Sequence, residues 1–316
     1  IEAGTGSFTI TVTARDAHGN PISGATVVLA ATGTANTLTQ PAGPTDASGV
    51  AAGALSSTRA EPKTVSATIN GVAVTQTAAV TVTVGAVSAA QSTVAAVPAT
   101  IEAGTGTAPI TVTALDAHGN PISGATVVLA ATGTGNTLTQ PAGPTDASGV
   151  ATGTLSSTKA EPKTVSATIS GVAVTQTATV QVTVGAVSAA QSTVAAAPAT
   201  IDAGTGSATI TVTARDANGN PISGAIVGLA ATGTDNTLTQ PAGPTDPNGV
   251  ATGSLSSAVA EVKTVSATIN GVAVIQTAAV TVTVGTGSAA PSSVVASPAT
   301  IDAGTGGTTI TVTARD

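Results

Sequence analysis

The acidic residues are the first candidates for chemistry, because they are few and recur about every 100 residues. If each repeat is one domain, Asp116 and Asp146 would lie at one of its ends and face Glu2 and Glu61 of the preceding domain. Carboxylate oxygens that converge from two domains suit Ca²⁺. Aspartate at such positions also caps its own turn, and Lys63 lies close enough in sequence to neutralise part of the charge. We favour the turn role, and a calcium site at Glu61, Asp116 and Asp146 stays the open alternative.

The two histidines offer acid–base chemistry, since histidine titrates near neutral pH. His18 and His118 occupy the same place in two repeats, and the third repeat has Asn218 there, so a turn residue explains all three. A serine or threonine nucleophile needs a base and an orienting acid, which two histidines cannot supply in every repeat. We therefore predict that the protein is not an enzyme, and we assign no catalytic, cofactor-binding or metal-binding residue and no cofactor.

The composition excludes further classes of function. Phe8 is the only aromatic residue among 316, and there is no Cys, Met, Trp or Tyr, which excludes a disulfide scaffold and an aromatic platform for nucleic acid. The net charge of −7 would repel nucleic acid, and we expect no small-molecule substrate. The Ala-Gly-Thr-Gly segments lack the lysine and helix of a phosphate-binding loop. Only 7% of the residues are charged and the mean hydropathy is +0.41, so the chain is expected to fold.

The sequence repeats with a period of 100 residues. The segment Ile-Glu/Asp-Ala-Gly-Thr-Gly recurs at Ile1, Ile101, Ile201 and Ile301. This period is too long for a solenoid unit, so each repeat should be a complete domain. We predict a repeat lacking its first strand at 1–89, complete repeats at 90–189 and 190–289, and the first strands of a fourth at 290–316. Linkers are expected at 85–91 and 185–191.

The hydrophobic pattern within a repeat is typical of β-strands. Ile110, Val112 and Ala114 alternate with polar residues, and Asn70-Gly71 predicts a two-residue hairpin turn. We expect one first strand from Ser92 through Thr100, with Pro98 at a sheet edge. We also expect one returning strand that carries on one face Val72, Val74, Ala78, Val80, Val82 and Val84. About seven strands in 100 residues predict an all-β fold of tandem immunoglobulin-like sandwiches, arranged as an extended rod.

The order of these motifs resembles the bacterial immunoglobulin-like domains of group 1, which occur in tandem in intimin and invasin adhesins and in giant bacterial surface proteins. The segments that carry the resemblance are Ile110 to Ala114, Asp116-x-x-Gly119-Asn120-Pro121-Ile122-x-Gly124, Val127, Thr145-Asp146-x-x-Gly149-Val150-Ala151 and Val165-x-Ala167-x-Ile169. The resemblance implies an exported bacterial protein at the cell surface, either anchored to the outer membrane or secreted as a filament. A membrane would be contacted only through regions outside this segment.

The near identity of the repeats predicts that each does the same mechanical job. The leading hypothesis is a structural stalk that projects a binding region from the cell, with neighbouring repeats as partners. The alternative is a binding module whose loops engage a host receptor or a glycan. A strand of about ten residues is about 33 Å long, so each repeat should advance about 40 Å. For the incomplete repeats at either end we favour a window on a longer chain, with strand donation to other copies of the chain as the alternative.

Overall fold

The computed structural model describes residues 1–285 and 288–315. Every helix or strand assigned within these residues is a β-strand. Among the described residues there is accordingly no helix that could span a membrane. The predicted all-β class is confirmed.

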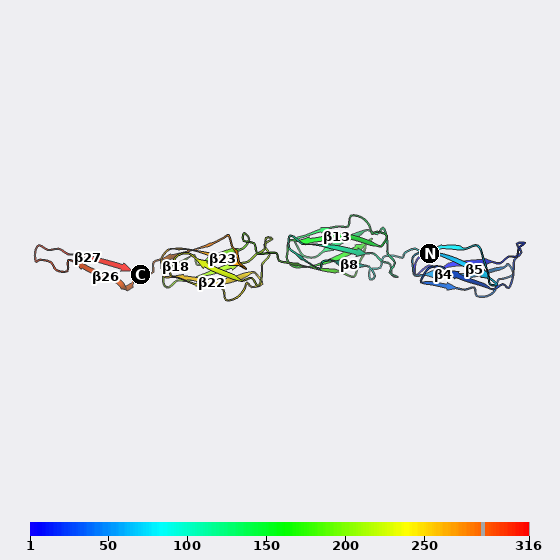
Figure 1. Cartoon of the computed structure of the whole chain (residues 1–316), viewed down its shortest axis with the longest axis horizontal. Helices are drawn as coiled ribbons and strands as arrows, with labels where there is room; N and C mark the ends of the chain where they lie inside the picture. Colours follow the sequence, from blue (N-terminus) through cyan, green and yellow to red (C-terminus); the bar gives the residue numbers. More distant parts are fainter. Residues whose placement is uncertain (286–287, 316) are drawn as a thin grey trace. The chain divides into compact units, whose positions relative to one another are not determined.

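Sandwich 1 is made of seven strands in two facing sheets (Figure 1). The first sheet has the strand order β1-β4-β3; in the second, β5 pairs with β2, β6 and β7. The strands of sandwich 1 are β1 (Phe8–Thr13), β2 (Val27–Ala31), β3 (Asn36–Thr39), β4 (Val50–Ser57), β5 (Pro62–Ile69), β6 (Val72–Ala73) and β7 (Ala78–Thr81).

Sandwich 2 repeats this arrangement with one more strand in each sheet. Its sheets have the orders β12-β13-β10-β8 and β11-β14-β16-β9, with β15 also paired to β14. The strands are β8 (Thr93–Ala96), β9 (Thr100–Glu102), β10 (Thr107–Thr113), β11 (Val127–Ala131), β12 (Asn136–Thr139), β13 (Val150–Ser157), β14 (Pro162–Ile169), β15 (Val172–Ala173) and β16 (Ala178–Thr183).

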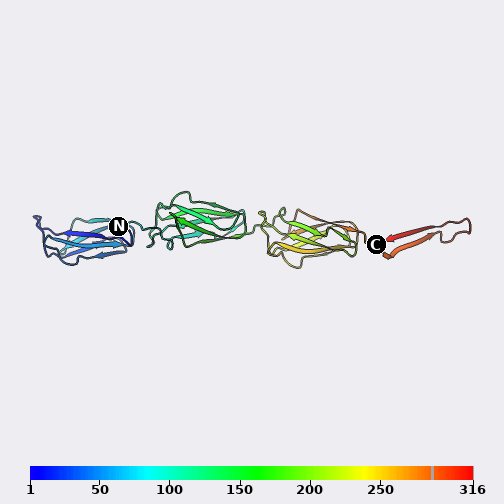
Figure 2. The ribbon, with the colours of Figure 1, turned by 180° about the vertical axis from the view of Figure 1, so that it is seen from behind.

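Sandwich 3 has the same topology, with sheets β17-β19-β22-β21 and β18-β25-β23-β20 and with β24 paired to β23. A separate antiparallel hairpin of β26 and β27 follows, and Figure 2 shows these two strands without a second sheet over them. The strands are β17 (Thr193–Ala197), β18 (Thr200–Asp202), β19 (Ala208–Thr213), β20 (Val227–Ala231), β21 (Asn236–Thr239), β22 (Val250–Ser257), β23 (Val262–Ile269), β24 (Val272–Ala273), β25 (Ala278–Thr283), β26 (Ser288–Ser297) and β27 (Thr309–Arg315).

The core of each sandwich is aliphatic, as the alternating pattern predicts. Ile110, Val112 and Ala114 are all fully buried, and Val165 and Ile169 face them from the other sheet with no exposed surface. Each buried Val or Ile side chain contributes about 1.5–3 kcal/mol on burial. The predicted hairpin turn is also confirmed, because Asn70 and Gly71 both have positive φ, at 49° and 81°.

Two predicted strands are wrong in extent. The expected first strand from Ser92 through Thr100 is two strands, β8 and β9, which belong to different sheets of sandwich 2. The expected returning strand is also interrupted, because β6 ends at Ala73 and β7 begins at Ala78. A period-two pattern reports which residues face inward, but a strand that leaves one sheet for another can keep that pattern.

The chain divides into two compact units. The first contains residues 1–101, 105–157 and 161–182, and the second contains Glu102–Gly104, Thr158–Ala160 and the residues from Thr183 onward. The division does not coincide with a repeat limit, because two short segments of sandwich 2 group with sandwich 3. These short segments belong to the contacts described next.

Candidate functional site at the repeat junctions

A docking loop, residues 116–120 and the equivalent residues 16–20 and 216–220, is organised by its own aspartate. Asp116 Oδ1 accepts hydrogen bonds from the backbone N–H groups of His118 at 2.8 Å and Asn120 at 2.9 Å. Asp116 Oδ2 accepts a third from Asn120 Nδ2 at 2.8 Å. Gly119 completes the turn with a φ of 79°. The turn role predicted for this aspartate is therefore present in the structure.

The docking loop of sandwich 2 binds the backbone of sandwich 1 through Asn120. The Asn120 Nδ2 group donates to the Thr58 carbonyl at 2.9 Å, and Asn120 Oδ1 accepts from the Ala60 N–H at 3.0 Å. Asn120 is only 1% exposed, and both hydrogens of its amide are used, one by Thr58 and one by Asp116. We call residues 58–60, and the equivalent 158–160 and 258–260, the receiving turn.

Asp116 joins the same junction from the other side of the loop. Its Oδ2 accepts from the Gly85 N–H at 3.0 Å, and Val87 forms an antiparallel bridge with it. Burial alone would raise the pKa of Asp116, which is 1% exposed. The hydrogen bonds from Asn120, Gly85 and His118 outweigh this effect and hold the pKa below its usual value. The carboxylate therefore stays ionised at neutral pH and keeps accepting all of these bonds.

The second unit contains a junction of the same construction. Asn220 Nδ2 donates to the Thr158 carbonyl at 2.9 Å, and Asn220 Oδ1 accepts from the Ala160 N–H at 3.0 Å. Asp216 Oδ2 accepts from the Gly185 N–H at 3.0 Å. In sandwich 1, Asp16 and Asn20 make the same bonds within their loop and are exposed. The internal bonds of the docking loop are therefore the same in the exposed loop of sandwich 1 and in the two buried loops.

A second contact at each junction involves the residue two places after the aspartate. The imidazole of His118 lies against Gly4, where a methyl group would collide with the ring. In the second unit Asn218 occupies this position, and its Nδ2 donates to the Ala103 carbonyl at 3.1 Å. The Ala-Gly-Thr-Gly segments thus form the surface that receives this residue.

The predicted linker 85–91 is bonded to the sandwich that follows it. Besides the Gly85 bond to Asp116, the Ser88 N–H donates to the Leu115 carbonyl at 2.8 Å. The Thr175 N–H and hydroxyl both donate to the Ala89 carbonyl at 3.0 Å. These bonds tie residues 85, 88 and 89 of the linker to sandwich 2.

Glu61, Asp116 and Asp146, the acids of the calcium hypothesis, each accept hydrogen bonds from different partners. Glu61 accepts from Lys63 Nζ at 2.5 Å, and this bond is the main reason that the pKa of Glu61 lies below its usual value. Asp146 caps its own turn by accepting from the Ser148 and Val150 N–H groups. Glu2 does approach Asp116, since both carboxylates lie beside Gly85. The described residues contain no group of three His, Cys, Asp or Glu side chains that could hold a metal ion.

The contact of Asn120 with the preceding repeat was not predicted, because in the sequence Asn120 is only one position of the Asp-x-x-Gly-Asn-Pro motif. A signal was present, because the Asp-x-x-Gly-Asn-Pro and Ala-Gly-Thr-Gly segments keep the same register in successive repeats. Two loops that meet across a joint must keep that register.

Family models and solved structures agree with this architecture. The model described as bacterial Ig-like domain (group 1) matches residues 3–85 and 191–285, and the model described as invasin, domain 3 matches residues 88–185. The chain belongs to the bacterial Ig-like domain (group 1) family. It is a tandem array of immunoglobulin-like sandwiches, as predicted, and neither matched family is a family of enzymes. No curated protein matches the chain.

Three solved structures are similar to the chain. FdeC, an adhesin of Escherichia coli, is 28% identical with a TM-score of 0.55, and the match covers 89% of this chain and 93% of that one. Invasin, a bacterial integrin-binding protein, is 23% identical with a TM-score of 0.55, covering 93% of this chain and 58% of that one. InvD of Yersinia pseudotuberculosis is 23% identical with a TM-score of 0.50, covering 89% and 93%. The chain is thus an adhesin-related array of Ig-like domains.

Proposed function

We propose that this chain is a stalk segment of a bacterial surface adhesin, which holds a binding region away from the cell. Its relation to adhesins supports an extracellular, surface-attached location. The repeat units are taken as 90–189 and 190–289, with 1–89 and 290–316 as parts of further repeats. The linkers 85–91 and 185–191 fold onto the repeat that follows each of them.

The observation that carries this proposal is the burial of Asn120 and Asn220 against main-chain groups of the preceding repeat. Each is 1% exposed, whereas the equivalent Asn20 is exposed. Each hydrogen bond contributes about 0.5–1.5 kcal/mol net, and leaving a buried partner unpaired costs about 1–3 kcal/mol. Because the partners are backbone groups, one repeat can follow another without a special side-chain match. This property suits a long array of nearly identical units.

The same contacts would limit bending. Each joint has the asparagine bonds to the receiving turn, the aspartate bond to the linker glycine, and the contact at position 118 or 218. Three repeats at about 40 Å each would then reach about 120 Å.

Small-angle scattering of the whole chain tests the proposal. We expect a maximum dimension of at least about 120 Å. The double variant Asn120→Ala, Asn220→Ala should give a broader and shorter distribution of dimensions. Asn20→Ala is the matched control, because it removes the same bonds within a docking loop but touches neither junction. A compact particle, or equal effects of Asn20→Ala and the double variant, would contradict the stalk. Binding of an isolated repeat to glycans or host cells would favour the alternative function.

A further inference from the structure

The receiving turn of sandwich 1 is held by bonds to another loop of the same sandwich. Ser57, which precedes the turn and is 3% exposed, donates through its hydroxyl to the Ala35 carbonyl at 3.1 Å. The same hydroxyl accepts from the Arg59 N–H at 3.1 Å. The Thr58 N–H donates to the Ala35 carbonyl at 3.2 Å. The position of the Thr58 carbonyl therefore depends on the loop of residues 32–35.

That loop is held in turn by a buried ion pair. Lys63 Nζ, with a fully buried side chain, donates to the Thr34 carbonyl at 2.6 Å and to Glu61. Glu61 Oε1 also accepts from the Thr34 N–H at 2.8 Å. The pair thus binds both polar backbone groups of Thr34. Glu61 directly follows Ala60, whose N–H binds Asn120, so one end of the receiving turn is fixed by the same pair.

The contribution of an ion pair to stability does not by itself explain why a lysine is buried at this position. Removing an ion pair from water costs several kcal/mol per charge, and apolar side chains of similar volume often serve stability as well or better. The lysine nevertheless recurs as Lys163 and Lys263, each fully buried and paired with the glutamate two residues before it.

We propose that Ser57 and the Lys63–Glu61 pair are positioning residues of the junction, which hold the Thr58 carbonyl and the Ala60 N–H where Asn120 can bind both. This inference rests on the stalk function proposed above and extends it to residues that do not touch the neighbouring repeat. Lys263 provides the comparison, because it makes the same contacts in sandwich 3 but lies under a turn that takes part in neither of the two junctions described.

The test compares Lys63→Met with Lys263→Met in the whole chain by amide hydrogen exchange. Methionine fills much of the lysine volume without its charge, and Glu61 is partly exposed, so water can solvate it. Both variants should change the unfolding free energy of their own sandwich by a similar amount. The informative amide is that of Gly85, which binds Asp116 but neither Ser57 nor Lys63.

We expect the Gly85 amide to exchange about tenfold faster in Lys63→Met and at the unchanged rate in Lys263→Met. An unchanged Gly85 amide in a folded Lys63→Met variant, or equal acceleration in both variants, would overturn the proposal. If Lys63→Met does not fold, Ser57→Ala provides the same test without a change of charge. Asn120→Ala measured in parallel separates the two proposals. If Asn120→Ala leaves the Gly85 amide protected, the proposed role of Asn120 in the junction is wrong. If Asn120→Ala accelerates Gly85 exchange and Lys63→Met does not, only the positioning role of Lys63 is wrong.

Discussion

Ile69 and Ile169 occupy equivalent positions in sandwiches of nearly the same sequence, yet Ile169 is fully buried and Ile69 is partly exposed. Val174 is likewise buried and Val74 is partly exposed. The difference lies at one sheet edge. In sandwich 2 the strand β8 pairs with β10 from Ile110 to Thr113 and covers this part of the core.

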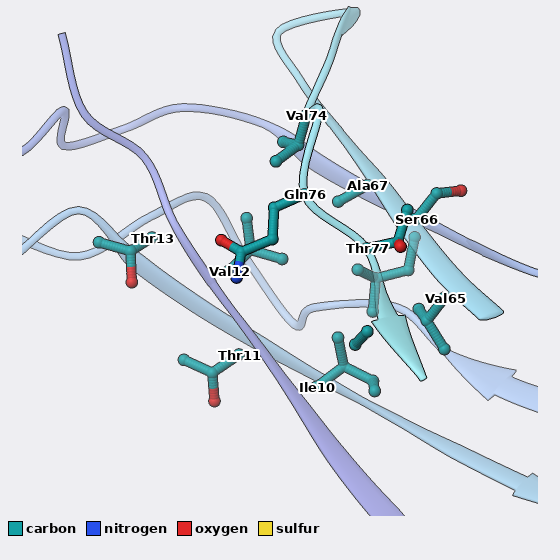
Figure 3. A pocket seen from close by; sticks show the side chains of 12 residues that line it. Ile10, Thr11, Val12, Thr13, Val65, Ser66, Ala67, Val74, Gln76 and Thr77 are labelled. Atoms are coloured by element: carbon teal, nitrogen blue, oxygen red, sulfur yellow. The ribbon is translucent and has the colours of Figure 1, made fainter. Parts of the chain in front are cut away.

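In sandwich 1 the corresponding part of β1 borders a groove of about 240 Å³ (Figure 3). The groove is lined by Ile10, Val12, Val65, Val74 and Ala78, among others. A core built only from Val, Ile, Leu and Ala has no large aromatic side chain to fill such a gap. The comparison therefore indicates that the short edge strands β8 and β17 contribute a large share of the stability of sandwiches 2 and 3.

The largest expected effect comes from supplying that strand to sandwich 1. Joining a copy of the sequence Gln91–Thr100 directly before Ile1 should raise the unfolding free energy of sandwich 1 by about 2–5 kcal/mol, because it buries one large aliphatic side chain and shields others. Calorimetry and the exchange of the Ile69 amide measure the gain. The same extension with Val94→Asp in the added copy is the control, and an equal gain from both would refute the role of the strand.

The reverse change should make sandwich 2 resemble sandwich 1. Val94 of β8 is 2% exposed, and Val94→Ala should cost about 1–3 kcal/mol through lost burial and the cavity that it leaves. Val97 lies one residue beyond β8 and is 73% exposed, so Val97→Ala should change stability by no more than about 0.5 kcal/mol. Chemical denaturation of both variants tests this pair, and similar losses would argue against β8 as the covering strand.

A smaller effect is expected from alanine at Gly4, and comparison with Gly204 distinguishes the loss of a junction contact from backbone strain. Gly4 and Gly204 have nearly the same φ, 81° and 78°, so alanine at either position should cost about 1 kcal/mol in strain. Only Gly4→Ala would also collide with His118, whereas a methyl group on Gly204 meets no atom of the described residues within 4 Å. Gly4→Ala should therefore loosen the first junction, as measured by exchange of the Gly85 amide, and Gly204→Ala should not. Equal exchange rates of the Gly85 amide in the two variants would mean that the His118 contact does not stabilise the junction.

The smallest effect is a dependence of the junction on pH. Because hydrogen bonds hold the pKa of Asp116 in the folded chain below the usual value of an aspartate, the stability that these bonds contribute is present above that usual value and is lost as the pH falls through the lowered pKa. The Gly85 amide shift should hence stay constant from neutral pH down to about pH 5 and change only in more acidic solution. Asp116→Asn should remove this transition. A transition near neutral pH would contradict the assignment to Asp116.

The strands and their inward faces were predictable because burial leaves a local pattern. Ile110 and Val112 alternate with threonine. Asn70 and Gly71 readily adopt the positive φ that a two-residue hairpin turn requires. The crossing from β8 to β9 was not predictable, since both segments share one hydrophobic pattern. The role of Asn120 was missed for a different reason, because its partners Thr58 and Ala60 lie about 60 residues away and are backbone atoms that leave no side-chain signature.

The burial of Lys63 was equally hidden. Sequence proximity indicated that it could offset Glu61, which the structure bears out with a direct ion pair. Lysine is almost always at the surface, so neither the burial of its amine nor its bond to the Thr34 carbonyl followed from composition.

The most direct test of the central claim measures the distance between the two repeats of the first junction. The chain has no cysteine, so Thr39→Cys and Thr139→Cys, at equivalent exposed strand positions, allow one spin label on each sandwich of the first unit. We predict one narrow distance distribution, which Asn120→Ala broadens and Asn20→Ala leaves unchanged. A broad distribution in the unsubstituted chain, or one that Asn120→Ala does not alter, would contradict a stalk whose joints are held by the docking loop.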